Sequence, residues 1–233
     1  MQLANAVVLI TGANRGIGLA FAREALARGA RKVYAAARDP ASVQIPGVHP
    51  IQIDVTDPDQ VARAARDCGD VTVVINNAGV ATTGGFLADT TLEATRRQLE
   101  TNFFGMLRMA QAFAPVLARN GGGAMLNVLS IASWINRPLL GTYGATKSAA
   151  WALTNGLRHE LREQGTQVTA LHMGFVDTDL ARGIGMPKST PESIVRAALD
   201  GLEAGADEVL ADEMSRQVKQ SLSSATAAYL AAA

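Results

Sequence analysis

The feature that most constrains the fold of this chain is a regular alternation of short apolar runs with longer amphipathic segments. The first run, Val7-Val8-Leu9-Ile10, has no polar residue at alternate positions. Strands that are buried on both faces have this pattern, whereas strands with one solvated face alternate. Buried strands joined by helices form parallel sheets with right-handed crossovers. The sequence therefore predicts an α/β fold with a doubly wound parallel sheet of about seven strands and helices on both faces.

The predicted elements follow one another without a repeat, a low-complexity tract or a Pro-rich linker. We therefore expect a single domain over residues 1–233. Strands are predicted at 7–11, 32–36, 48–53, 71–75, 124–129, 167–171 and 208–210. Helices are predicted at 17–28, 58–67, 92–119, 142–163 and 191–203.

Composition excludes several classes of protein. Hydrophobic residues make up 48% of the 233 residues, which predicts a sizeable core rather than disorder. The 21 basic and 21 acidic residues cancel, so no nucleic-acid partner is expected. Cys68 is the only cysteine and no Cys/His cluster has metal-ligand spacing, so we expect neither a disulfide nor a metal site. The N-terminus lacks the pattern of a signal peptide and no apolar stretch suits a bilayer, which predicts a cytoplasmic protein without a membrane partner.

A glycine-rich loop, TGANRGIG at 11–18, lies between the first predicted strand and the first predicted helix. Glycines in this position let the backbone turn tightly and approach a pyrophosphate, and the helix N-terminus supplies free N–H groups and a positive dipole end. The strand–loop–helix context favours a nucleotide site on a Rossmann-like fold. The candidate cofactor-binding residues of the loop are Gly12, Asn14, Arg15, Gly16, Ile17 and Gly18.

Further segments follow this loop in a fixed order: Asn76-Asn77-Ala78-Gly79, Asn102, Ser130, and a YxxxK motif at 143–147. Ser130 stands thirteen residues before Tyr143. With these motifs and the TGxxxGxG spacing, the chain resembles the short-chain dehydrogenase/reductase family, and in particular an NADP-preferring, carbonyl reductase-like member. The resemblance extends from residue 11 to about residue 180. It implies a homodimer or homotetramer and the catalytic residues Asn102, Ser130, Tyr143 and Lys147.

The end of the second strand predicts the choice of cofactor. An acid at this point binds the ribose of NAD, whereas an arginine accommodates the 2′-phosphate of NADP. By the resemblance, Ala37 occupies the position of the acid and Arg38 follows it. Arg38 and Arg15 together predict NADPH/NADP+ as the cofactor. The alternative is that Arg38 is a solvated charge and Asp39 is the ribose ligand.

The resemblance implies further cofactor contacts along the chain. Asp54 and Val55 are expected beside the adenine, although Asp54 could instead cap a turn or helix. Asn76 is expected both to line the ribose and to fix the central strand. In the segment after the sixth strand, Met173 stands where the family commonly has proline. The remaining expected contacts are Ala78, Gly79, Tyr143, Lys147, Gly174, Val176 and Thr178.

The reaction chemistry centres on Tyr143 and Lys147, which share one face of a helix because they are four residues apart. A phenol has a pKa near 10, and a nearby ammonium favours the phenolate. Tyr143 is therefore the expected acid/base. Ser130 is expected to donate to the developing oxyanion, with Ser133 as its competitor. By the resemblance, the backbone carbonyl of Asn102 holds a water that leads to Lys147.

The expected substrate is a small hydrophobic aldehyde, ketone or alcohol. A short lid near 179–190 offers few groups for discrimination, and Trp134, Ile135, Leu139, Leu140 and Met173 are candidate apolar walls. His172 is expected to be an ordinary core histidine. The sequence thus predicts a reversible, NADPH-dependent reduction in which Tyr143 supplies the proton. The alternatives are a non-catalytic NADP-binding regulator and a lyase or epimerase on the same fold.

Overall fold

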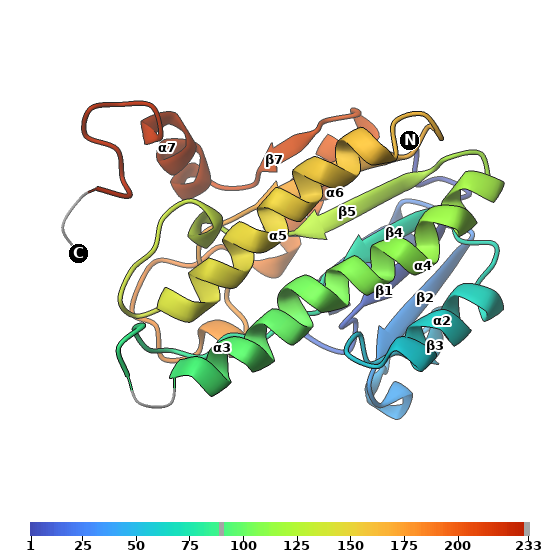
Figure 1. Ribbon diagram of the computed structural model, residues 1–233. Coiled ribbons are helices and arrows are strands. Elements are labelled where there is room, and N and C mark those ends of the chain that lie inside the picture. The colour runs from blue at the N-terminus through green and yellow to red at the C-terminus, as the bar shows by residue number, and fades with distance from the viewer. Residues whose placement is uncertain (89–90, 231–233) are drawn as a thin grey trace.

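The computed structural model describes residues 1–88 and 91–230. Its centre is one seven-stranded sheet with the order β3-β2-β1-β4-β5-β6-β7, in which every pair of neighbours is parallel (Figure 1). The predicted fold class is confirmed. The strand order reverses between β1 and β4, which is where open α/β sheets place their ligands. The strands are β1 (Val7–Thr11), β2 (Lys32–Ala37), β3 (His49–Gln52), β4 (Val73–Asn76), β5 (Ala124–Val128), β6 (Gln167–His172) and β7 (Glu208–Leu210).

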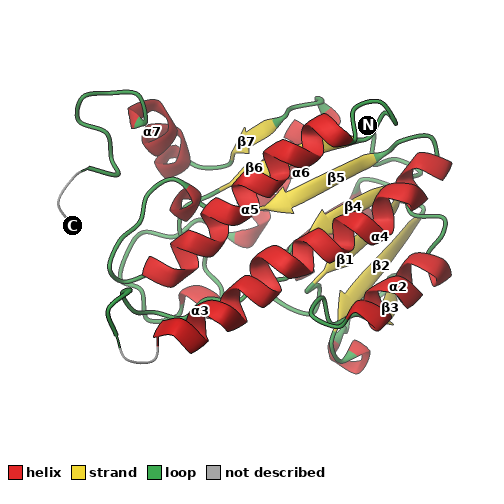
Figure 2. Cartoon of the chain, viewed as in Figure 1, coloured by secondary structure: helices red, strands yellow, loops and turns green. Residues whose placement is uncertain are grey.

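Helices cover both faces of the sheet (Figure 2). Residues of α1 and α6 pack in one core, and residues of α2, α4 and α5 pack in the other. The α-helices are α1 (Gly16–Ala27), α2 (Pro58–Asp67), α3 (Thr91–Leu99), α4 (Met106–Arg119), α5 (Gly141–Glu160), α6 (Pro191–Glu203) and α7 (Glu213–Ser221). Three short 3-10 helices, η1 (Pro40–Ser42), η3 (Ile131–Ser133) and η4 (Asp179–Ala181), and a π-helical segment, η2 (Glu100–Gly105), lie in the connections.

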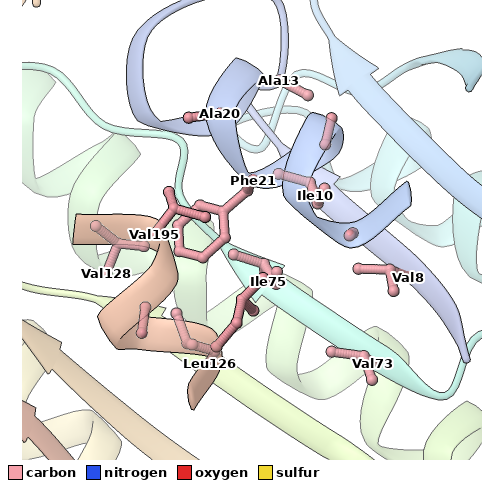
Figure 3. Close-up of a cluster of buried hydrophobic side chains, with 14 of the residues drawn as sticks. Val8, Ile10, Ala13, Ala20, Phe21, Val73, Ile75, Leu126, Val128 and Val195 are labelled. Atoms are coloured by element: carbon pink, nitrogen blue, oxygen red, sulfur yellow. The ribbon is translucent and has the colours of Figure 1, made fainter. Parts of the chain in front are cut away.

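Strand β1 shows why the apolar runs in the sequence are continuous. Its five residues are all buried, and successive side chains point to opposite faces of the sheet. Val8 and Ile10 join the core under α1 and α6, together with Phe21 and Val195 (Figure 3). Val7 and Leu9 join the core on the other face.

Several elements are shifted by one to three residues from their predicted bounds, as β4 and α5 are, and two differ in kind from the sequence-based expectation. The helix expected at 92–119 is three consecutive pieces, because η2 interrupts the α-helical pattern between α3 and α4. Helix α7 was not predicted, because it is short and only Met214 and Val218 of its nine residues are apolar. Asp212 caps α7 by accepting a hydrogen bond from the backbone N–H of Ser215 at 2.8 Å.

Candidate active site

The loops that follow β1, β2, β3, β4, β5 and β6 surround one large cleft at the carboxyl ends of the strands. Its volume is about 1400 Å³, which exceeds the usual range for a single drug-sized ligand. Within residues 1–88 and 91–230, no helix is long and apolar enough to cross a membrane. The same residues contain no group of three acidic, His or Cys side chains arranged to hold a metal ion.

The glycine loop forms one wall of the cleft with a backbone that other residues would not adopt. Gly12 and Gly16 have positive φ angles of 66° and 54°. A Cβ atom on Gly18 would overlap the carbonyl oxygen of Gly12, so the helix packs directly on the loop. Asn77 holds the loop by donating from Nδ2 to the Gly12 carbonyl at 3.2 Å.

The N-terminus of α1 is left open for a ligand. Arg15 occupies the N-cap position without a side-chain cap, and no acid stands in the first turn. The first N–H groups of a helix lack partners within the helix and carry a positive partial charge. Five of the predicted loop residues line the cleft: Gly12, Asn14, Arg15, Gly16 and Ile17. Gly18 does not line it, but packs against the Gly12 carbonyl.

The two arginines expected to read the cofactor phosphate both border the cleft. Arg38 is exposed, and Arg15 forms an ion pair with Asp179 of η4 at 3.3 Å. Asp39, the alternative ribose ligand, accepts from the Ala41 N–H at 3.0 Å and so caps η1. This cap occupies one oxygen of the Asp39 carboxylate and favours Arg38 as the residue that selects the cofactor.

Asp54 lies on the cleft beside Val55 and also holds a turn. Its Oδ1 accepts from both the N–H and the hydroxyl of Thr56, at 2.9 and 2.7 Å. The N-cap of α2 is Asp57, so Asp54 is a turn cap but not the helix cap. The turn fixes the carboxylate at the cleft, which leaves the adenine role open.

Ala78 and Gly79 line the cleft, but Asn76 does not. Asn76 is buried in β4 and donates from Nδ2 to Oδ1 of Asn127 in β5 at 2.8 Å. Its side chain thus joins the two central strands, which is the structural half of the role expected for it. Asn127 in turn donates from Nδ2 to the hydroxyl of Thr154 in α5 at 3.0 Å.

Asn102 lies in the π-helical segment η2, a kind of segment that is frequent at functional sites. Its side chain is buried and bonds Val80 twice, accepting from the N–H at 2.8 Å and donating to the carbonyl at 2.9 Å. It also donates to Thr146 of α5 at 2.9 Å. Sequence reasoning missed this side-chain role, for which the only signal was an Asn within a predicted helix.

Ser130, Tyr143 and Lys147 all line the cleft. The Lys147 ammonium donates to the Val128 carbonyl at 2.8 Å and lies 5.7 Å from the centre of the Tyr143 ring. The Ser130 hydroxyl accepts from the Ala132 N–H at 3.1 Å and hydrogen-bonds the Tyr143 phenol. Ser133 is buried and does not line the cleft, and its hydroxyl has no hydrogen-bond partner within residues 1–88 and 91–230. The structure therefore favours Ser130 over its competitor.

Burial dominates the acidity of both titrating groups. It raises the pKa of Tyr143 to about 12, and the hydrogen bond with Ser130 offsets only part of the rise. Burial also lowers the pKa of Lys147 to about 8. The expectation that the ammonium makes this phenol more acidic is thus not met in this structure. Tyr143 is protonated at neutral pH and suited to donate a proton.

The segment after β6 forms a further wall of the cleft and lies next to the glycine loop, since a Cβ atom on Gly16 would contact Thr178. Gly174, Val176 and Thr178 line the cleft, and the Gly174 N–H donates to the Asp212 carboxylate at 2.7 Å. The lid near 179–190 is tied back to this segment because the Ser189 N–H donates to the Phe175 carbonyl at 2.9 Å.

The apolar wall differs in part from the one expected. Ile135, Leu139, Leu140 and Met173 line the cleft, but Trp134 does not. Instead, the Trp134 ring stacks on His172. Sequence reasoning missed further apolar residues of the lining, among them several from the segment after β6, the lid and α7: Phe175, Leu180, Ala181, Ile184, Met186 and Met214. Exposed Arg96 and Arg97 of α3 also border the cleft.

Comparisons with known proteins identify the family of this chain. A family model described as short chain dehydrogenase matches residues 6–188. Dehydrogenase/reductase SDR family member 7B of Bos taurus is 33% identical over 195 residues, which are 76% of this chain and 60% of the bovine protein. The chain thus spans well under the full length of that relative. The 1-deoxy-11-beta-hydroxypentalenate dehydrogenase of Streptomyces exfoliatus is 33% identical over 81% of this chain and 74% of its own.

A solved structure is still more similar. A short chain dehydrogenase from Burkholderia cenocepacia J2315, crystallised in complex with NADP, superposes with a TM-score of 0.93 and 40% sequence identity. The superposition covers 97% of this chain and 95% of the Burkholderia chain. With the family match over most of its length, this chain belongs to the short-chain dehydrogenase family.

Proposed function

We propose that this chain is an NADP-dependent oxidoreductase that reduces a hydrophobic aldehyde or ketone to an alcohol, in a reversible reaction. The observation that carries the proposal is the position of the Tyr143 phenol, which lines the cleft together with Ser130 and lies one helical turn from Lys147. A non-catalytic NADP-binding regulator would need the glycine loop but not this arrangement.

The cleft fits an NADP dinucleotide by size and by chemistry. Its volume of about 1400 Å³ leaves room for a substrate beside the cofactor. The open N-terminus of α1 suits the pyrophosphate, and Arg15 and Arg38 suit a 2′-phosphate. A hydrogen bond between a guanidinium and a phosphate contributes about 1.5–3 kcal/mol, so two arginines account for a preference of orders of magnitude. The similar Burkholderia protein was crystallised with NADP.

The bound dinucleotide would supply or accept the hydride, and the residues of this chain would manage the proton. At neutral pH the Tyr143 hydroxyl carries the proton that the developing alkoxide needs. The Ser130 hydroxyl has a single hydrogen, which points to the phenol oxygen in the free site and would turn to the developing oxyanion of the substrate when Tyr143 donates its proton. Lys147, anchored on the Val128 carbonyl, keeps an ammonium next to the phenol below pH 8.

The walls of the cleft favour a substrate of low polarity. Met173, Met186 and Met214 come from three different segments and all line the cleft. Methionine side chains are flexible and polarisable, so they adapt to apolar groups of different shapes. Arg96 and Arg97 add positive charge at one part of the lining, so a keto acid is a useful contrast to neutral substrates.

A spectrophotometric screen tests this proposal. Aromatic and aliphatic ketones, aldehydes and one keto acid are offered with NADPH and with NADH in parallel. We expect oxidation of NADPH with neutral hydrophobic carbonyls and much less with NADH. No oxidation of either cofactor with any carbonyl, together with tight NADPH binding, would favour a regulator. Cofactor-dependent conversion without net NADPH consumption would favour a lyase or epimerase.

The proposal includes assembly into a homodimer or homotetramer and a cytoplasmic location. Exposed apolar side chains on η2 and α3, Phe104 at 42% and Leu92 at 63%, are consistent with contacts between copies. Light scattering of the purified protein measures the assembly, and cell fractionation measures the location.

A further inference from the structure

His172, the last residue of β6, contacts the segment that carries Ser130. Its side chain is fully buried, and Nδ1 lies 3.1 Å from the Ser130 carbonyl oxygen. The same carbonyl accepts from the Ser133 N–H at 3.0 Å, and the next residue, Ile131, donates its N–H to the Met173 carbonyl at 2.9 Å. The end of β6 thus holds the Ser130 turn through one side chain and through the backbone.

The partner at Nδ1 determines which ring nitrogen carries the proton. A carbonyl oxygen can only accept, so the hydrogen lies on Nδ1, and Nε2 has a free lone pair. Among the residues that the structure describes, Nε2 has no hydrogen-bond partner, and it lies 3.5 Å from the Glu208 carboxylate. Burial lowers the pKa of His172 to about 3, and positive charges on Lys219, Lys147 and Arg158 act in the same direction. The ring is therefore neutral over the pH range of ordinary assays.

Aromatic packing fixes the orientation of this ring. The Trp134 indole stacks on it with a centroid distance of 3.8 Å and an interplanar angle of 20°. Trp134 in turn packs edge-on against Trp151 of α5 at 6.3 Å, and the Lys219 ammonium of α7 lies 4.8 Å from its centroid. In Figure 1, α7 lies toward the end of the molecule to which the β5 and β7 arrows point. Rotation of the imidazole away from Ser130 would disrupt this stack.

We propose that His172 is a positioning residue, whose Nδ1–H fixes the Ser130 backbone so that the Ser130 hydroxyl meets the Tyr143 phenol. The inference rests on the proposed reductase function. The Ser130 hydroxyl acts on the pKa of that phenol, and the His172 side chain contacts the backbone carbonyl of the same serine. A displacement of about 1 Å at a reacting group can reduce the rate about 100-fold.

Two amide substitutions separate positioning from filling of space. In His172→Asn the amide nitrogen takes the place of Nδ1 and can still donate to Ser130, but the shorter side chain leaves a cavity. In His172→Gln the amide extends toward the place of Nε2, which fills the volume but directs its donor away from Ser130. The positioning role predicts that Asn retains more kcat than Gln, whereas cavity formation predicts that Asn has the lower Tm.

The test measures kcat, the KM for NADPH and Tm for both variants and for Ser133→Ala as the control. Ser133 lies in the same turn, and its buried hydroxyl has no hydrogen-bond partner in the described part of the chain, so its loss should leave kcat unchanged. We expect kcat to fall about tenfold or more in the Gln variant and about threefold or less in the Asn variant, with the KM for NADPH unchanged in both. The proposal is overturned if kcat follows Tm, so that Gln is the better enzyme, or if both variants match wild type.

A measurement on the wild-type protein keeps the proposal independent of turnover and of variant folding. Two-bond ¹H–¹⁵N correlation spectra distinguish the two neutral tautomers of a histidine. We expect His172 as the Nδ1–H tautomer, with shifts that do not change between pH 5 and 8. An Nε2–H tautomer, or titration in this range, overturns the proposal. If the wild type turns over no carbonyl while this tautomer is observed, the proposed function fails but the contact does not.

Discussion

Lys147→Met tests the electrostatic account of the site through stability rather than activity. Burial lowers the pKa of the Lys147 ammonium from 10.5 to about 8, so the unfolded chain binds this proton more tightly than the folded chain does. At pH 7 the difference of about 2.5 units destabilises the folded state by about 3 kcal/mol. Methionine removes that cost and loses the hydrogen bond to Val128, which contributes about 1.5–3 kcal/mol for a charged donor. The variant should therefore be about as stable as wild type at pH 7, or more stable, although it loses a proposed catalytic residue.

The pH dependence of the free energy of unfolding is a more specific test than the stability at a single pH. Between pH 8 and 10.5 the unfolded chain holds more protons at this residue, so wild-type stability should rise with pH. The cost of the buried ammonium falls from about 3 kcal/mol at pH 7 to about 2 kcal/mol at pH 9, and the variant should lose about 1 kcal/mol relative to wild type over this interval.

Urea unfolding of wild type, Lys147→Met and Tyr143→Phe at pH 7 and 9 measures both effects. Tyr143→Phe is the matched control, because a phenol with a pKa of about 12 does not titrate below pH 9 and its difference from wild type should not change between the two pH values. A Lys147→Met variant several kcal/mol less stable than wild type, with a difference independent of pH, would refute the reasoning.

Three other variants test separate parts of the site. Arg38→Asp should raise the KM for NADPH at least tenfold and leave the KM for NADH similar or lower, because an acid repels a 2′-phosphate. Steady-state kinetics with both cofactors measure this effect. An unchanged preference for NADPH would favour Asp39 as the residue that selects the cofactor. Ser130→Ala should shift the pH profile of alcohol oxidation to higher pH, since the Ser130 hydrogen bond lowers the pKa of the Tyr143 phenol; an unshifted profile contradicts that role. Gly18→Ala should lower Tm and weaken NADPH binding in a fluorescence titration, because its Cβ would overlap the Gly12 carbonyl; a variant with wild-type binding and Tm contradicts the packing described for the loop.

The fold was predictable because its elements carry strong local signals. The apolar run of β1 is buried on both faces, and Thr190 and Asp57 cap helices whose first residue is proline, as their positions in the sequence indicate. Helix α7 carries no such apolar signal. It is held by Asp212, whose carboxylate accepts from both Ser215 and Gly174, and this second contact joins residues 38 positions apart.

The site residues that belong to a short motif were predictable from the sequence. The properties that depend on contacts between distant parts of the chain were not. The YxxxK spacing places Tyr143 and Lys147 on one face of α5, and both reach the cleft. Their acidities depend on burial in the folded chain, so the rise in the pKa of Tyr143 to about 12 was outside the reach of sequence reasoning. His172 was expected to be an ordinary core residue, because its contact with Ser130 exists only when β5 and β6 are paired.

The most direct test of the central claim is a single-turnover measurement with NADPH and a neutral hydrophobic ketone, on wild type and Tyr143→Phe at matched NADPH saturation. Absorbance at the nicotinamide band follows the reaction, and fluorescence titration verifies binding in both proteins. We predict that both proteins bind NADPH equally and that the rate of NADPH oxidation falls about 100-fold or more in the variant, because the proton donor is gone. Equal rates in the two proteins would contradict the account.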